Sequence, residues 1–208
     1  MAIYDVAIVG AGVTGSAVAR ELSRRKGRFV VLERALDVCE GTSKANSAIM
    51  HAGFDAEPGT MKAKMNVRGN QMMDQLSGEL DIPFRRVGAF VVCFSKEELP
   101  KLKELYDRGV ANGVSGMELL TGEQARALEP NLSEEVEGAL LAHTSGIVCP
   151  FELTLGLAES AAKNGWSSPL TPRSPAWSRG KRAGWSTPAG GTMPPGRWST
   201  PPGCPPAR

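Results

Sequence analysis

The stretch YDVAIVGAGVTGSAVARELSRRKGRFVVLER, residues 4–34, predicts a parallel βαβ unit built around a glycine-rich turn. The apolar run at residues 6–9 is typical of a strand that is buried in a parallel sheet. Apolar residues at helical spacing predict a helix over about residues 13–25, which Gly27 ends, and residues 28–33 predict a second strand. The opening of the chain therefore predicts an α/β fold.

Three glycines of this stretch, Gly10, Gly12 and Gly15, have the spacing GxGxxG. In such a turn the first glycine permits the tight bend, the second lets a pyrophosphate approach the backbone, and the third lets the helix pack closely on the strand. The helix also presents free N–H groups and the positive end of its dipole to the phosphates. Glu33, 23 residues after Gly10, can accept the hydroxyl hydrogens of an adenosine ribose and would repel a 2′-phosphate. The set predicts a dinucleotide site, against a purely structural βαβ unit, and does not separate NAD from FAD.

The next segment, EGTSKANSAIMHAGFDAEPGT at residues 40–60, is rich in small polar side chains. Thr42, Ser43, Asn46 and Ser47 can form hydrogen bonds with phosphate oxygens or with the edge of a flavin. The same residue types also cap helices and form turns, so the residues alone leave both interpretations open.

GTSKANSAIMHAGF, residues 41–54, resembles the segment after the second strand in FAD oxidoreductases of the D-amino-acid-oxidase type. Within that family it is most similar to the branch of glycerol-3-phosphate dehydrogenases and L-2-hydroxyglutarate oxidases. The similarity continues through the blocks at 84–114, 118–132 and 138–165, and covers about residues 3–165. FAD is the cofactor that the resemblance implies.

The resemblance also implies the site residues. His51 and Gly53 are expected to face the flavin and the substrate, with His51 as the catalytic base that takes the hydroxyl proton while hydride passes to flavin N5. A polar turn residue is the alternative for His51, and covalent attachment of flavin to it is not expected. The expected cofactor contacts are Gly10, Gly12, Val13, Thr14, Gly15, Glu33, Arg34, Thr42, Ser43, Lys44, Asn46, Ser47 and Gly53.

The expected activity is FAD-dependent oxidation of a small anionic hydroxy substrate, glycerol 3-phosphate first, with electrons passed to an unidentified acceptor. L-2-hydroxyglutarate is the alternative substrate. An inactive, truncated fragment is the alternative of a different class.

The expected fold is a Rossmann-like FAD-binding domain with an inserted α+β substrate domain, both incomplete. Residues 1–80 are assigned to the N-terminal part of the FAD-binding domain and residues 81–149 to a partial substrate domain. Residues 150–165 are expected to form a helix that returns to the FAD-binding domain, and residues 166–208 a disordered tail.

Local patterns predict the elements of the middle of the chain. Residues 85–94 are predicted as one strand that contains a glycine, followed by a helix with Ser95 as its N-cap. A second short helix is predicted after Thr121, with Gln124 three residues on as in a capping box. Residues 137–150 are predicted as a further strand with a turn.

Some charged residues of the middle have both a functional and a structural interpretation. The pair Arg85 and Arg86 could bind an anionic substrate, although paired arginines more often form a solvated surface. His143 follows an apolar run, where a structural role is favoured.

Composition limits the class of protein further. Cys39, Cys93, Cys149 and Cys204 form no CxxC pair, so neither a metal cluster nor a disulfide framework is expected. No apolar run is long enough for a membrane span and no leader peptide is evident, so a cytoplasmic protein is expected, with peripheral membrane association left open. Nucleic acid is not expected as a partner.

Residues 166–208 differ in composition from the rest of the chain. They contain six Lys and Arg, no Asp or Glu, 10 of the 15 Pro and all 4 Trp. Such a segment buries too little apolar surface to offset the entropy of ordering it. A polyproline ligand or a non-specific nucleic-acid contact are the functional alternatives.

A frame slip at about Gly165–Trp166 is our hypothesis for this composition. With a suitable choice of synonymous codons, a constant one-base shift converts WSSP at 166–169 into VEFP. The same shift converts RWSTPPGC at 197–204 into VVNAAGV. Both products are segments that the family resemblance leads us to expect at these places. Sequencing of the coding DNA tests the hypothesis, because a slip requires a single-base offset that restores the motif.

Overall fold

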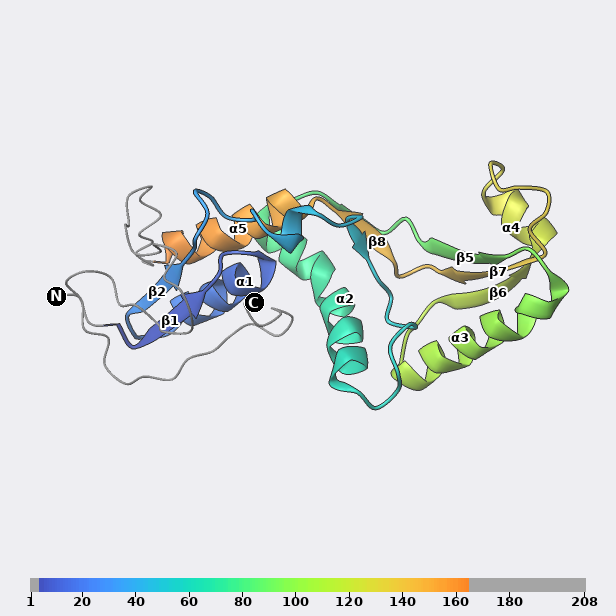
Figure 1. Cartoon of the computed structure of the whole chain (residues 1–208), viewed down its shortest axis with the longest axis horizontal. Coiled ribbons are helices and arrows are strands. Elements are labelled where there is room, and N and C mark those ends of the chain that lie inside the picture. The colour runs from blue at the N-terminus through green and yellow to red at the C-terminus, as the bar shows by residue number, and fades with distance from the viewer. Residues whose placement is uncertain (1–3, 165–208) are drawn as a thin grey trace, which may run out of the picture. The chain divides into compact units, whose positions relative to one another are not determined.

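The computed structural model describes residues 4–164, and the chain divides into two compact units (Figure 1). Within the described residues, the first unit comprises residues 4–46, 80–82 and 150–164, and the second comprises Ser47–Glu79 and Pro83–Cys149. The tail predicted at 166–208 and the frame slip at Gly165–Trp166 lie outside the described residues.

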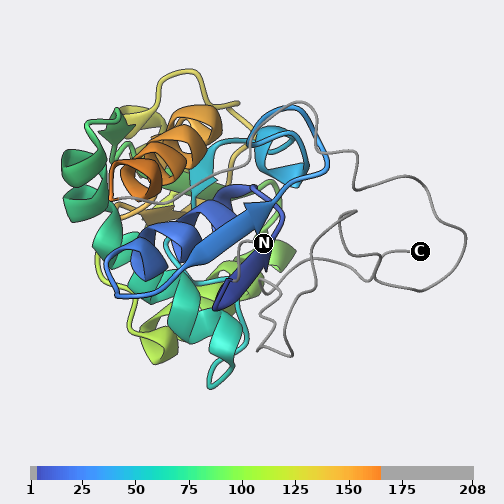
Figure 2. The ribbon, with the colours of Figure 1, turned by 90° about the vertical axis from the view of Figure 1, so that its left-hand side faces the viewer.

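The first unit has the predicted strand–turn–helix–strand order. Its described elements are β1 (Val6–Val9), α1 (Val13–Ser23), β2 (Phe29–Leu32), the 3-10 helix η1 (Thr42–Lys44) and α5 (Pro150–Lys163). β1 and β2 are parallel, with Val6 opposite Phe29, and α5 lies alongside α1 (Figure 2). Ile8 and Val31 of the strands pack with alanines of both helices in one apolar core. The helix α1 ends slightly earlier than predicted, because the N–H of Arg25 bonds to the carbonyl of Leu22 (2.9 Å) and closes the last turn.

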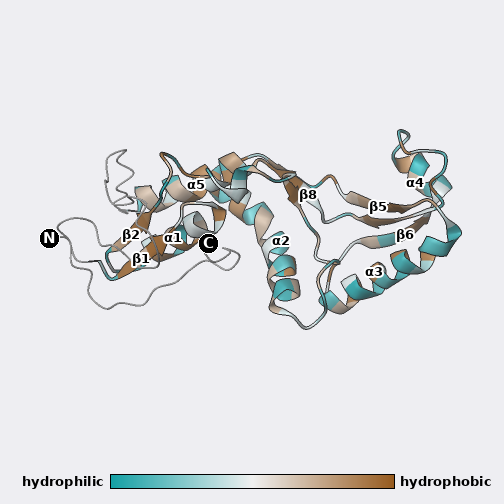
Figure 3. Ribbon diagram, in the orientation of Figure 1, coloured by the Kyte–Doolittle hydropathy of each residue, from teal (hydrophilic) through white to brown (hydrophobic). Residues whose placement is uncertain are grey.

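The second unit is built on two antiparallel sheets, with strand orders β3-β8-β4 and β5-β7-β6. Leu102 of the helix α3 packs against Leu140 and Ala142 of the central strand β7. Figure 3 shows the corresponding contrast between the apolar strands β5 and β7 and the mostly hydrophilic residues of α3. The described elements are β3 (Ile49–Met50), α2 (Met61–Leu80, whose last residue belongs to the first unit), β4 (Phe84–Arg85), β5 (Ala89–Cys93), η2 (Lys96–Glu98), α3 (Leu99–Asn112), β6 (Met117–Thr121), α4 (Gly122–Leu128), β7 (Gly138–Ala142) and β8 (Gly146–Val148).

Two predictions for this unit were wrong in detail. The single strand predicted at 85–94 is divided at Gly88, whose φ of 74° turns the chain so that β4 pairs with β8 and β5 with β7. Ser95 lies at the N-cap of the 3-10 helix η2, which precedes α3, but its side chain makes no capping hydrogen bond. The carboxylate of Glu98 instead accepts a bond from the N–H of Phe94 (3.2 Å).

The capping box predicted for the short helix α4 is confirmed. The Thr121 hydroxyl accepts from the N–H of Gln124 (3.2 Å), and the Gln124 side chain accepts from the N–H of Thr121 (2.9 Å).

Candidate functional site

The glycine-rich turn of the first unit joins β1 to α1 with very little space between them. Gly10 has a φ of 95°, which residues with a side chain rarely adopt, and its N–H bonds to the carbonyl of Leu32 in β2 (2.8 Å). A Cβ on Gly15 would lie 1.9 Å from the carbonyl oxygen of Gly10, so alanine does not fit there. The first turn of α1 therefore lies directly against the end of β1.

The N-terminus of α1 has the properties of an anion site. Gly12 is its N-cap, and no acidic side chain lies in the first turn. The hydroxyl of Ser43 in η1 accepts a hydrogen bond from the N–H of Val13 (2.9 Å). A Cβ on Gly12 would lie 2.9 Å from the same hydroxyl oxygen. The fold thus brings Ser43 from a later segment to the helix end, where the dipole favours negative charge.

Glu33 follows β2 and reaches back to the glycine-rich turn. One carboxylate oxygen accepts from the N–H of Ala11 (2.7 Å) and the other from the N–H of Ala35 (2.9 Å). Each oxygen of an ionised carboxylate has two acceptor positions, so each retains one for a ligand hydroxyl. Gly12, Val13, Glu33 and Ser43 are therefore grouped around one helix end.

Cys39 and Asn46 stabilise the segment that carries Ser43. The N–H of Cys39, a buried residue with a φ of 65°, bonds to the carbonyl of Ala11 (3.1 Å). Asn46 donates from its side chain to the carbonyl of Ser43 (2.7 Å). Cys39 was not among the predicted site residues, and its cysteine side chain gives no indication of a left-handed backbone.

The remaining residues predicted in the first unit lie at its surface. Lys44 forms an ion pair with Glu40 (2.8 Å) on the exposed side of η1. Thr14, Arg34 and Thr42 are exposed.

Ser47, His51 and Gly53 belong to the second unit. Ser47 is exposed just before β3, and His51 follows directly after that strand. The imidazole of His51 is 56% exposed, with its Nδ1 3.6 Å from a carboxylate oxygen of Asp55. Gly53 has a φ of 118°, and a Cβ there would lie 2.6 Å from a methyl carbon of Val67. Position 53 therefore requires a glycine both for its backbone conformation and because a Cβ there would collide with Val67.

Arg86 is engaged inside the second unit rather than available to an anionic ligand. Its guanidinium donates to both carboxylate oxygens of Asp74 (3.1 and 3.0 Å from Nε) and to the side-chain oxygen of Asn70 (2.9 Å). It also lies over the ring of Phe84, 5.2 Å from its centre. The interpretation of Arg86 as a substrate contact is therefore not favoured.

The ion pair of Asp74 and Arg86 predicts a pH dependence of stability. The hydrogen bond from Arg86 lowers the pKa of Asp74 below its usual range. A lowered pKa stabilises the fold above the unfolded-state pKa of about 4, and this contribution is lost as the pH falls through the folded-state value. Because Asp74 is largely exposed, we expect Asp74→Asn to lower the free energy of unfolding at pH 7 by at most about 1 kcal/mol. Urea unfolding followed by circular dichroism at neutral and acidic pH measures this, and an undiminished difference at about pH 3 contradicts it.

His143 follows β7 and contacts the neighbouring strand, and its structural role stays a prediction. Its Nε2 lies 3.1 Å from a carboxylate oxygen of Glu118 on the neighbouring strand.

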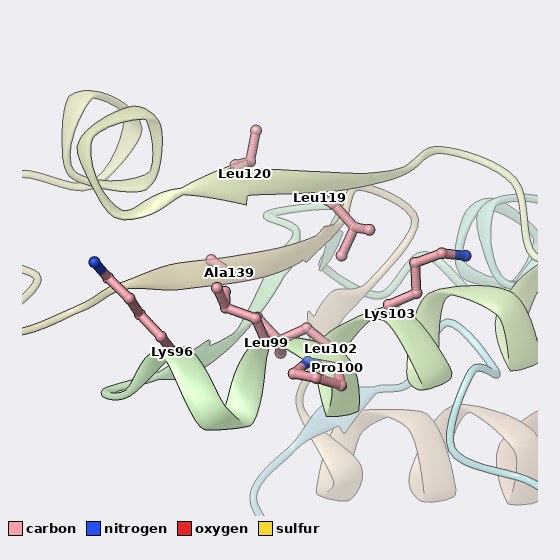
Figure 4. Close-up of a pocket in the computed structure, with 8 residues that line it drawn as sticks. All are labelled: Lys96, Leu99, Pro100, Leu102, Lys103, Leu119, Leu120 and Ala139. Carbon is pink, nitrogen blue, oxygen red and sulfur yellow. The ribbon is translucent and has the colours of Figure 1, made fainter.

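An apolar groove also lies in the second unit, between α3 and the strands β6 and β7 (Figure 4). Its lining includes Leu99, Leu102 and Leu119, with Lys96 and Lys103 at its rim. None of the predicted site residues lines it.

Two classes of site are absent from the part of the chain that the structure describes. Within residues 4–164, no helix combines the length and the apolar character that crossing a membrane requires. In the same range, His, Cys, Asp and Glu side chains form no group of three or more that could hold a metal ion.

Comparison with known proteins identifies relatives of this chain. The family model described as "FAD dependent oxidoreductase" (DAO) matches residues 5–167. A glycerol 3-phosphate dehydrogenase of Caloramator mitchellensis is 48% identical over 163 residues, which are 78% of this chain and 34% of the relative. A mitochondrial L-2-hydroxyglutarate dehydrogenase of Arabidopsis thaliana is 38% identical over 76% of this chain and 32% of its own length.

A solved structure shows the same fold. The L-alpha-glycerophosphate oxidase of Mycoplasma pneumoniae with FAD bound is 31% identical, with a TM-score of 0.76 over 81% of this chain and 44% of that one. This chain therefore spans about a third of the length of the two curated relatives and less than half of the solved one.

Proposed function

We propose, because the chain belongs to the DAO family of FAD dependent oxidoreductases, that its site binds FAD and oxidises glycerol 3-phosphate. The observation that carries the proposal is the grouping of Glu33, Ser43 and the N-terminus of α1 around the turn at Gly10–Gly15. The substrate follows from the glycerol 3-phosphate dehydrogenase and the glycerophosphate oxidase among the relatives.

The residues of the turn fit the adenine dinucleotide part of FAD. The N–H groups of the first turn of α1 would bind the pyrophosphate, with Gly12 offering no Cβ to obstruct it. The hydroxyl of Ser43 already occupies this helix end as a hydrogen-bond acceptor. The two oxygens of Glu33, held by Ala11 and Ala35, would accept the ribose hydroxyls.

His51 is the proposed base of the oxidation. When bound, FAD supplies the acceptor for the hydride of the substrate carbinol. The exposed imidazole of His51 takes the hydroxyl proton, and the carboxylate of Asp55 near its Nδ1 stabilises the resulting positive charge. We also propose that the reduced flavin passes its electrons to a further acceptor, and that the protein is located in the cytoplasm.

L-2-hydroxyglutarate is the second candidate substrate, on the basis of the Arabidopsis relative. Both candidates are small anions with a secondary hydroxyl group, so the chemistry at His51 is the same for either. An inactive fragment is the alternative of a different class, because the chain spans only part of its relatives' length.

Reconstitution of the purified chain with FAD tests the proposal. We expect flavin absorbance to remain with the protein after desalting, and glycerol 3-phosphate to be oxidised with a dye as acceptor. Faster turnover of L-2-hydroxyglutarate would favour the second substrate. Complete loss of flavin on desalting would contradict the proposal and favour the inactive fragment.

A further inference from the structure

We propose that Asn70, oriented by Arg86, is a positioning residue that fixes the backbone of His51. The proposal rests on the proposed role of His51 as the base. It concerns residues of the second unit alone, so it does not depend on how FAD is held by the first unit.

Asn70 has the contacts of a residue that can adopt only one orientation. It is 4% exposed, and its side-chain amide donates to the carbonyl of His51 (3.0 Å) and to that of Thr144 (2.9 Å). Its side-chain oxygen accepts from Arg86 (2.9 Å). Both amide hydrogens and the oxygen are therefore engaged. An apolar replacement would leave the carbonyl of His51 with the longer bond from Asn66 (3.3 Å) and that of Thr144 with the bond from Arg86.

Arg86 holds the amide of Asn70 in this orientation. Its guanidinium is fixed by Asp74, and it donates to the backbone carbonyls of Asn70 (2.8 Å) and Thr144. The helix α2, the segment between β4 and β5, and the turn between β7 and β8 thus converge on the carbonyl of His51 through one network. A network with every member satisfied resists local rearrangement more than a single hydrogen bond does.

A second asparagine holds the other end of the segment. The side chain of Asn112, at the end of α3, donates to the carbonyls of Gly53 (3.0 Å) and Ala56 (2.7 Å). The carbonyls of both His51 and Gly53 are therefore held by asparagine side chains, and Ala52 between them is buried. The imidazole of His51 nevertheless remains exposed, so a fixed backbone presents an accessible side chain, as a positioned base requires.

The test uses the fact that the chain contains only two histidines, His51 and His143. We expect Asn70→Asp, which keeps the size and the bond with Arg86 but loses both donations, to shift the ring NMR resonance of His51 by more than its line width. His51→Gln assigns the resonances, and an unchanged far-UV circular dichroism spectrum shows that the variant is folded. Gln75→Ala, which removes an exposed amide from the same helix, should move neither resonance.

A folded Asn70→Asp chain with an unmoved His51 resonance would overturn the proposal, even if its unfolding temperature were lower. If that variant does not fold, Arg86→Lys decides by the same readout, because lysine keeps the charge but cannot donate in several directions at once. FAD titration is a separate measurement: failure of the wild-type chain to bind FAD would contradict the proposed function and leave the NMR criterion unaffected.

Discussion

Gly15→Ala is expected to abolish FAD retention and to destabilise the chain by about 3 kcal/mol. The new Cβ would lie 1.9 Å from the carbonyl oxygen of Gly10 and 3.5 Å from a methyl carbon of Ile8. A backbone oxygen cannot move aside as a flexible side chain can, so α1 must separate from β1. Its first N–H groups would then no longer lie beside Glu33 and Ser43. Chemical denaturation and flavin absorbance after desalting measure the two effects.

Two other glycines provide matched controls for this experiment. A Cβ on Gly69, in the exposed part of α2, meets nothing within 4 Å, so Gly69→Ala should leave FAD binding unchanged and stabilise the helix by up to about 1 kcal/mol. Gly122→Ala places a Cβ 1.8 Å from the carbonyl oxygen of Val136, an equally severe conflict in the second unit. If Gly15→Ala and Gly69→Ala retained flavin equally, the turn would not be the cofactor site.

The βαβ part of the first unit could be predicted because the residues that determine it are close together in the sequence. The strand, the glycine-rich turn, α1 and β2 follow one another within 31 residues, and each has a period or a glycine that identifies it. The capping box of Thr121 and Gln124 is local in the same way. The prediction at 85–94 was wrong because continuous apolar residues favour one strand, whereas the turn at Gly88 depends on its bond to the distant carbonyl of Ser145.

The sequence indicated several residues of the candidate site, but it did not indicate which hydrogen bonds they form. Ser43 was expected as a polar residue near the cofactor, but its bond to Val13 spans 30 residues and follows from the fold alone. Asn70 was not predicted at all, since an asparagine within a helical segment has no local feature that marks its tertiary hydrogen bonds. Arg86 had two interpretations, and only the positions of Asp74 and Asn70 show that it is engaged internally.

Glu33→Gln is expected to weaken FAD binding by about 10- to 100-fold, the effect of losing a hydrogen bond to a charged group. The two oxygens of Glu33 accept from the N–H groups of Ala11 and Ala35. Glutamine has one oxygen, so its NH₂ group must face one of these N–H groups, and it can offer a ribose hydroxyl one acceptor fewer. One of the two bonds that hold the side chain would then be lost, because two donors cannot share one hydrogen bond.

Fluorescence titration of FAD measures this loss, with urea unfolding of the FAD-free chain as a check on the fold. Glu40→Gln is the matched control, because Glu40 pairs at the surface with Lys44, close to the same site in sequence, and bonds to neither Ala11 nor Ala35. Its dissociation constant should stay within about twofold of the wild type, since exposed ion pairs contribute little. Equal affinities of Glu33→Gln and the wild type would show that Glu33 serves only to hold the turn. The bonds to Ala11 and Ala35 alone would then account for the position of Glu33. The ribose hydroxyls would have to bind to other residues.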